Sequence, residues 1–105
     1  MKQIEPKDLK PNYNIIDIRD SNAYNKNHIY NAKNIAMNLL TNIPEKYLNK
    51  NETYYIYCSS GYKSQKCCRL LEKKGYDTVS IIGGYDKYKE ELMWLTKEMI
   101  LIHLF

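Results

Sequence analysis

Several residue types that mark particular classes of protein are scarce in this chain of 105 residues. It has three cysteines, an odd number that cannot all pair with one another, so a disulfide-stabilised scaffold is disfavoured. Its apolar runs, such as residues 99–102, are far shorter than the roughly 20 residues that cross a bilayer. Residues 1–7 carry charge but lack the apolar segment of a secretion signal. We therefore expect a protein of the reducing cytoplasm that has no membrane partner.

Arginine is also scarce, since only Arg19 and Arg69 accompany 14 lysines in a chain of net charge +4. The lysines are scattered along the sequence, whereas a nucleic-acid-binding surface more often gathers arginine and lysine into one stripe. We expect no nucleic-acid partner, although the positive charge favours the approach of small anions. The chain contains no repeat and no linker rich in glycine, serine or proline, which indicates one continuous unit.

What the sequence does contain is an alternation of strand and helix patterns. Strands are predicted at 13–18, 53–57 and 78–82, with a weaker extended segment at 34–36. The clearest helical pattern covers 62–74 and ends at Gly75, and further helices are predicted at 86–95 and 43–48. Such alternation favours a parallel sheet with helices on both faces. Ligands of these sheets bind beyond the carboxyl ends of the strands, so the turn after Tyr57 is the first candidate site.

That turn places Cys58 between a buried strand and the start of a helix. The first amides of a helix have no partner within it, and the amides of a short loop beside them can curl around a sulfur atom. These hydrogen bonds and the helix dipole favour the thiolate, which makes Cys58 a candidate nucleophile. Gly61 allows the backbone to turn its amides inward, and Lys63 adds a positive charge that suits an anionic substrate. The loop alone leaves open a cysteine that is simply buried at the end of a strand.

Four motifs in order along the chain resemble the rhodanese family of sulfurtransferases in its one-domain form. They are Asp17-Ile18-Arg19-Asp20 followed by Tyr24, then His28 to Ile35, the Cys58 loop, and Gly83-Gly84. The resemblance covers roughly residues 4–88 and implies an α/β fold with a central five-stranded parallel sheet flanked by helices on both faces. It also implies a cysteine that takes a sulfane sulfur from a small anionic donor such as thiosulfate, holds it as a persulfide and passes it on. The acceptor would be cyanide, a small thiol or a protein thiol.

The resemblance also implies which residues form the site. Cys58 would carry the sulfur, and a cradle around it would come from the loop residues Ser59, Ser60, Gly61, Tyr62 and Lys63. Arg19 is a further candidate for contacting the substrate, although its pairing with Asp17 is mainly structural in the family. His28 is expected to fasten a loop, because the persulfide route needs no general base once the thiolate has formed. No metal and no cofactor is expected.

Three positions depart from the family pattern. Tyr30-Asn31 replaces a frequent Pro-Gly turn, and Tyr88 stands where tryptophan is common. Lys63 replaces a frequent arginine, which exchanges a planar fork for a point charge and leaves the preferred donor open.

Two other functions stand beside the sulfurtransferase. A cysteine-dependent phosphatase of related fold would need an arginine six positions after Cys58, where this chain has Ser64. A non-catalytic protein-interaction module usually lacks the nucleophile, and Cys58 is present. Cys67 and Cys68 have no partner at metal-chelating spacing, so packing in the core is predicted for at least one of them.

Residues 93–105 lie beyond the last family motif and are rich in apolar residues. We therefore divide the chain into a domain at 1–92 and a C-terminal apolar helical extension at 93–105. So many apolar side chains cannot all stay exposed on a monomer, so the extension should dock on its own domain or on a second copy. The expected state is a monomer or a homodimer through this tail, with docking on the same chain preferred.

Overall fold

The structure is a computed structural model that describes residues 1–104, with side chains described as far as residue 99. Its strands are β1 (Lys2–Ile4), β2 (Asn14–Asp17), β3 (Lys33–Asn34), β4 (Thr53–Tyr57) and β5 (Asp77–Ile81). They form one sheet in the order β1-β5-β4-β2-β3, and every neighbouring pair is parallel. The expected five-stranded parallel sheet is confirmed.

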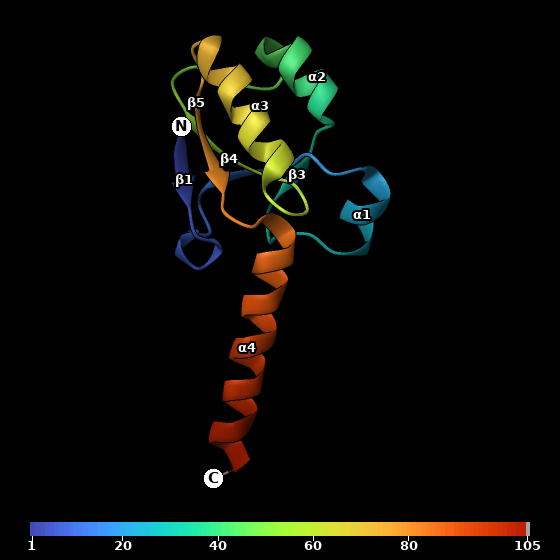
Figure 1. Ribbon diagram of the computed structural model, residues 1–105, viewed down its shortest axis with the longest axis vertical. Coiled ribbons are helices and arrows are strands. Elements are labelled where there is room, and N and C mark those ends of the chain that lie inside the picture. Colours follow the sequence, from blue (N-terminus) through green and yellow to red (C-terminus); the bar gives the residue numbers. More distant parts are fainter. Residues whose placement is uncertain (105) are drawn as a thin grey trace.

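The helices are α1 (Ser21–Lys26), α2 (Met37–Asn42), α3 (Tyr62–Lys73) and α4 (Gly84–Leu104), with short 3₁₀ turns η1 (Pro6–Asp8) and η2 (Pro44–Lys46). Figure 1 shows α2 and α3 beside the sheet and α4 leaving it as a long rod. The predicted stop at Gly75 is confirmed, because Gly75 adopts φ 90° just after α3. The amide of Tyr76 then bonds the Leu71 carbonyl at 3.1 Å, which closes the helix end.

Side chains on the two faces of the sheet form two cores, because successive residues of a strand point to opposite sides. Ile16 and Ile56 pack against the α2 and α3 side chains Leu40, Cys67, Cys68 and Leu71. Their neighbours Ile15 and Tyr57 point the other way and pack with Tyr24 of α1 and with Tyr85 and Tyr88 of α4. Helical segments therefore cover both faces, as expected.

Some short elements differ from the sequence prediction. The extended segment expected at 34–36 is β3 at Lys33–Asn34, and the helix expected at 43–48 is the 3₁₀ turn η2 that follows α2. The elements β1, α1 and α2 were not predicted. The strand β1 has three residues and pairs only with β5, while α1 buries none of its residues and so carries no apolar periodicity.

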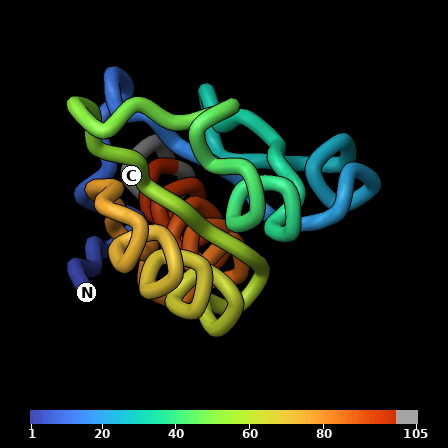
Figure 2. Tube along the Cα trace, turned by 90° about the horizontal axis from the view of Figure 1, so that it is seen from above, coloured from blue at the N-terminus to red at the C-terminus, as the bar shows by residue number. Residues whose placement is uncertain are grey.

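The helix α4 continues without a break past the domain. Seen from above, its turns lie one behind another, so the helix runs along the long axis of a molecule measuring 53 × 26 × 22 Å (Figure 2). Its side chains beyond the domain are exposed: Leu92 by 46%, Met93 by 54%, Trp94 by 64% and Leu95 by 59%. The preference for docking on the same chain is therefore wrong for these residues, and the side chains of 100–105 lie outside the described ones. Within the described residues, no helix combines the length and apolar character needed to span a membrane.

Candidate active site

The thiol of Cys58 lies at the carboxyl end of β4, the middle strand of the sheet. The residue is only 4% exposed, and its Sγ accepts hydrogen bonds from the amides of Gly61 at 3.2 Å and Ser64 at 3.3 Å. The loop thus turns backbone donors toward the sulfur. These donors stabilise a negative charge on Sγ, because they are fixed by the fold before any charge develops.

Gly61 makes this inward turn possible. It adopts φ 98° and ψ −13° at the position just before α3, a left-handed conformation that residues with a Cβ rarely take. A Cβ at this position would also lie 3.1 Å from the amide nitrogen of Gly83. The glycine therefore serves both the turn and the close approach of a second loop.

Ser64 is a part of the site that sequence reasoning missed. Its side chain is fully buried, and its Oγ donates to the Gly61 carbonyl at 3.0 Å and shares a 3.0 Å hydrogen bond with Ser80 Oγ of β5. The loop is thereby tied to the neighbouring strand. Its position in the first turn of a helix behind a cysteine loop was a usable signal, but its partner Ser80 lies 16 residues away and only the fold brings them together.

The first turn of α4 holds the same loop from the other side. The amide of Tyr85 donates to the Cys58 carbonyl at 2.9 Å, and that of Asp86 donates to the Ser59 carbonyl at 2.9 Å. A Cβ on Gly84 would lie 2.4 Å from the Cys58 oxygen and 2.7 Å from the Ser59 oxygen. Gly84 of the Gly83-Gly84 motif is thus explained by contact between α4 and the Cys58 loop, whereas a Cβ on Gly83 would meet the side chain of Lys87.

An open depression of about 400 Å³ lies above the thiol, lined by Ile18, Arg19, Asp20, Cys58, Ser59, Ser60, Tyr62 and Lys63. The fold brings together every residue that the sequence analysis named for the site. Gly61 does not line the depression but donates its amide to the sulfur. Ile18 and Asp20 were not expected. Asp20 caps α1 by accepting the Ala23 amide at 2.9 Å, which fixes the rim of the depression.

Arg19 lines the depression, but its guanidinium is held by the protein. It donates to the carboxylate of Asp17 through Nε and Nη2, and from Nη2 also to the Asn27 carbonyl at 2.7 Å. Its cationic carbon lies 4.2 Å from the centre of the Tyr85 ring. Burial opposes the charge, but the hydrogen bonds and negative charge of Asp17 outweigh it and raise the pKa of Arg19.

Tyr57 extends this network into the core. Its hydroxyl donates to Asp17 at 2.6 Å and accepts the Ile29 amide at 3.1 Å. Burial first, and then the hydrogen bond to Asp17, raise the pKa of Tyr57 far above its ordinary value, so the phenol remains a donor. The network joins the end of β2 to the segment after α1.

His28 does not line the depression above Cys58. It is exposed, its Nδ1 donates to the Tyr24 carbonyl at 2.8 Å, and its ring stacks on that of Tyr24 with centroids 3.8 Å apart. These contacts match the expected role of fastening a loop.

Cys67 and Cys68 are fully buried and unpaired by disulfides, so the predicted core packing is confirmed for both. Burial raises the pKa of Cys67 to about 12 and that of Cys68 to about 11. Both thiols are therefore protonated near neutral pH. Within the described part of the chain, no group of three or more histidine, cysteine or carboxylate side chains could hold a metal ion.

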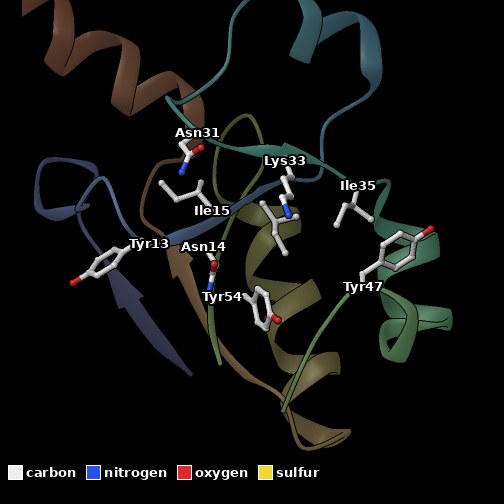
Figure 3. A pocket seen from close by; sticks show the side chains of 9 residues that line it. Tyr13, Asn14, Ile15, Asn31, Lys33, Ile35, Tyr47 and Tyr54 are labelled. Carbon is white, nitrogen blue, oxygen red and sulfur yellow. The ribbon is translucent and has the colours of Figure 1, made fainter. Parts of the chain in front are cut away.

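A second, smaller cavity of about 110 Å³ lies near the starts of β2 and β4 (Figure 3). It forms because β3 pairs only with Ile16 and Asp17, which leaves the earlier part of β2 uncovered on that side. Asn14, Lys33 and Tyr54 are among its lining residues, and no cysteine or histidine lines it. Cys58 lies at the opposite edge of the sheet, just beyond the carboxyl end of β4.

Comparison with known proteins places this geometry in context. A family model described as a rhodanese-like domain matches residues 2–91. Among curated proteins, a thiosulfate sulfurtransferase, GlpE, of Coxiella burnetii is 36% identical over 76 residues, covering 71% of this chain and 70% of that protein. A putative sulfurtransferase, YtwF, of Bacillus subtilis is 33% identical over 79 residues, covering 73% of this chain and 74% of that protein.

Solved structures give the same picture. A rhodanese-like domain protein of Staphylococcus aureus has 35% identity and a TM-score of 0.71, covering 84% of this chain and 91% of that one. A rhodanese-related protein of Thermoplasma volcanium has 26% identity and a TM-score of 0.78, covering 87% of this chain and 93% of that one.

Proposed function

The chain belongs to the rhodanese-like family, and from this premise we propose that it is a thiosulfate sulfurtransferase that works through a Cys58 persulfide. The Cys58 thiolate attacks the outer sulfur of thiosulfate, the sulfur–sulfur bond breaks, and sulfite leaves with the bonding electron pair. A thiophilic acceptor then attacks the outer sulfur of the persulfide. The Cys58 thiolate is the leaving group, so the enzyme returns to its starting state.

The observation that carries this proposal is that two backbone amides donate hydrogen bonds to Sγ of Cys58. The donors of Gly61 and Ser64 stabilise the attacking thiolate at the start of the cycle and again when it leaves. Ser59, Ser60, Tyr62 and Lys63 line the depression where the donor anion would bind, with Lys63 supplying a positive charge. Arg19 shapes the wall of this depression, since its hydrogen bonds to Asp17 and Asn27 hold it in place.

The two alternatives find less support. At the position where a cysteine-dependent phosphatase would need arginine, Ser64 is buried and bonded to Gly61 and Ser80. A non-catalytic interaction module does not require a thiol, whereas here the thiol lies beneath an open depression and accepts hydrogen bonds from two amides. The relatives named as sulfurtransferases also favour an enzyme.

We further propose that the acceptor is cyanide, a small thiol or a protein thiol, and that the protein works in the cytoplasm. The depression is open on its outer side, so an acceptor can approach the outer sulfur while Sγ stays buried. All three cysteines are free, and free thiols persist in a reducing compartment.

The test is the mass of the intact protein after incubation with thiosulfate and removal of the excess. We expect the parent protein to gain one sulfur atom, and a reductant or cyanide to remove it. Cys58→Ser should gain none and should lose transfer from thiosulfate to cyanide while keeping its circular dichroism spectrum. Cys67→Ser and Cys68→Ser are the matched controls and should keep most of the activity, because those thiols are buried and protonated. Sulfur transfer by Cys58→Ser would refute the assignment.

A further inference from the structure

The part of α4 beyond the domain carries large apolar side chains that the described residues, 1–99, leave mostly exposed. Glu90, Met93, Trp94 and Lys97 are spaced three, four and seven residues apart, so they share one face of the helix. Together they line a shallow depression of about 270 Å³. Met93 is 54% exposed and Trp94, the single tryptophan of the chain, is 64% exposed. An exposed tryptophan beside a second large apolar side chain is typical of a protein interface.

A different side of α4 faces its own domain. Tyr85 and Tyr88 pack into the core on the α1 side of the sheet, and Leu92 follows one turn later on the same side. Trp94 points away from that side, because each residue turns the helix by about 100°. Met93 lies between the two sides, since it also lines a depression with Tyr85 and Leu92. The domain therefore leaves Met93 more than half exposed and Trp94 64% exposed, so a partner could cover the face of Glu90, Met93, Trp94 and Lys97.

This face is complementary to itself when two copies of α4 lie antiparallel. A two-fold axis between Met93 and Trp94 places Met93 of one copy on Trp94 of the other, and Trp94 on Met93. The same axis places Glu90 opposite Lys97 of the second copy, and it does so twice. A parallel arrangement would set Glu90 against Glu90 and Lys97 against Lys97, which charge repulsion disfavours. The order of charges along the helix thus selects the antiparallel pair.

We propose that this face of α4 is a homodimer interface in which two α4 helices cross antiparallel at Met93 and Trp94. The two Met93–Trp94 contacts bury the exposed apolar surface, and the two Glu90–Lys97 pairs set the register. An anionic membrane is a poorer partner, since residues 86–98 carry four acidic and three basic side chains, whereas membrane-surface helices are rich in lysine and arginine. This interface does not depend on the chemistry of Cys58.

Charge reversal on the full chain tests the interface. Sedimentation equilibrium over a range of concentrations should show a reversible monomer–dimer equilibrium. Glu90→Lys and Lys97→Glu should each raise the dimer dissociation constant by about tenfold, because each sets like charges against each other twice. The double reversal Glu90→Lys with Lys97→Glu should return to within about threefold of the parent. The two residues are about 10.5 Å apart along one helix, so rescue within a single chain is not expected.

Trp94 gives a second readout and Glu91→Lys gives the control. Tryptophan fluorescence should shift to the blue as the concentration rises through the dissociation constant, because Trp94 leaves water. Glu91→Lys makes the same change of charge about 100° around the helix and should leave the dimer unaffected. A protein that stays monomeric, a dimer insensitive to both single reversals, or a double reversal as weak as the singles would each overturn the proposal. A blue shift of the monomer only on adding anionic vesicles would also overturn it, in favour of a membrane surface.

Discussion

The sulfur of Cys58 accepts hydrogen bonds from two backbone amides. The two cationic side chains that line the depression, Arg19 and Lys63, differ in how firmly the protein holds them. The guanidinium of Arg19 is held by Asp17 and by the Asn27 carbonyl. Among the described residues no ion pair involves Lys63, which is exposed and lines the depression. Lys63 is therefore the side chain best placed to attract an anionic donor. The amides should still contribute more, because they are fixed whereas a lysine stem must be ordered at each encounter.

We therefore expect Lys63→Ala to lower kcat/KM for thiosulfate by about tenfold, near 1.4 kcal/mol, mainly through a higher KM. Lys63→Glu should be worse because it sets a like charge beside both thiolate and donor, and Lys63→Arg should retain activity. Steady-state kinetics at low and moderate salt is the measurement, since an electrostatic effect weakens as salt rises. Lys66→Glu, an exposed change one turn further along α3, is the control. If Lys63→Ala and Lys63→Glu both showed the kinetics of the parent, the Lys63 side chain would not contribute, and backbone amides alone would bind the anion.

Among the site residues, the sequence predicted those whose roles depend on neighbours in the chain. Cys58, Gly61 and Lys63 could be named because a strand, a short loop and a helix start follow one another in the chain. Ser64 could not, since its role depends on Ser80 of another strand. The contacts that hold Arg19 could not be predicted either, because they come from the Asn27 carbonyl eight residues away and from the ring of Tyr85.

Two helices together determine where the Cys58 loop lies. The start of α3 supplies amides to Sγ, and the start of α4 supplies amides to the carbonyls of Cys58 and Ser59. The approach of α4 is so close that Gly84 has no room for a side chain. The loop is thus clamped between two helix ends that are far apart in sequence.

Gly84→Ala tests this clamp. The added Cβ would lie 2.4 Å from the Cys58 oxygen, so the loop or α4 must move and the amides on Sγ must shift with it. We expect a loss of about 1–3 kcal/mol in the free energy of unfolding and a fall of at least about tenfold in kcat/KM. Urea unfolding and sulfur-transfer kinetics measure the two effects.

Gly75→Ala is the matched control for that substitution. Gly75 also has a positive φ, but a Cβ there would meet only the far end of the Lys50 side chain at 3.4 Å. It should therefore cost about 1 kcal/mol of stability through backbone strain and leave kcat/KM unchanged. Equal activity of the two variants would mean that α4 does not position the loop.

The elements that sequence patterns predicted best are those that bury side chains. The strands β2, β4 and β5 and the helix α3 all show this, and Gly75 marks the end of α3 as expected. Patterns failed for β1 and α1, whose residues are mostly exposed, and for α2, since a helix was expected only at 43–48. Short elements of this kind are held by contacts with the rest of the domain, and local propensity does not encode such contacts.

The molecule consists of a domain and a projecting helix, and among the side chains that the structure describes only those of the domain form a packed core. Both cores draw on residues no later than Tyr88, and the family match ends at residue 91. The sequence predicted an apolar helical tail but not that the helix would project away from the domain. The amphipathic pattern is lost at residues 92–95, which are all apolar. A helix that is apolar on several sides does not reveal from its sequence which side the domain covers.

This division predicts the behaviour of a chain that stops after Glu91. Its α4 would still bring Tyr85 and Tyr88 into the core and would still supply the amides of Tyr85 and Asp86 to the Cys58 loop. Because Leu92 to Leu95 are largely exposed, their loss should change the melting temperature by less than about 5 °C, or about 1 kcal/mol. Thiosulfate should still add one sulfur atom to Cys58. Removing Met93, Trp94 and Lys97 should nevertheless leave a monomer at every concentration. A truncated chain that unfolds, or that loses the persulfide while remaining folded, would show that the projecting helix belongs to the catalytic domain.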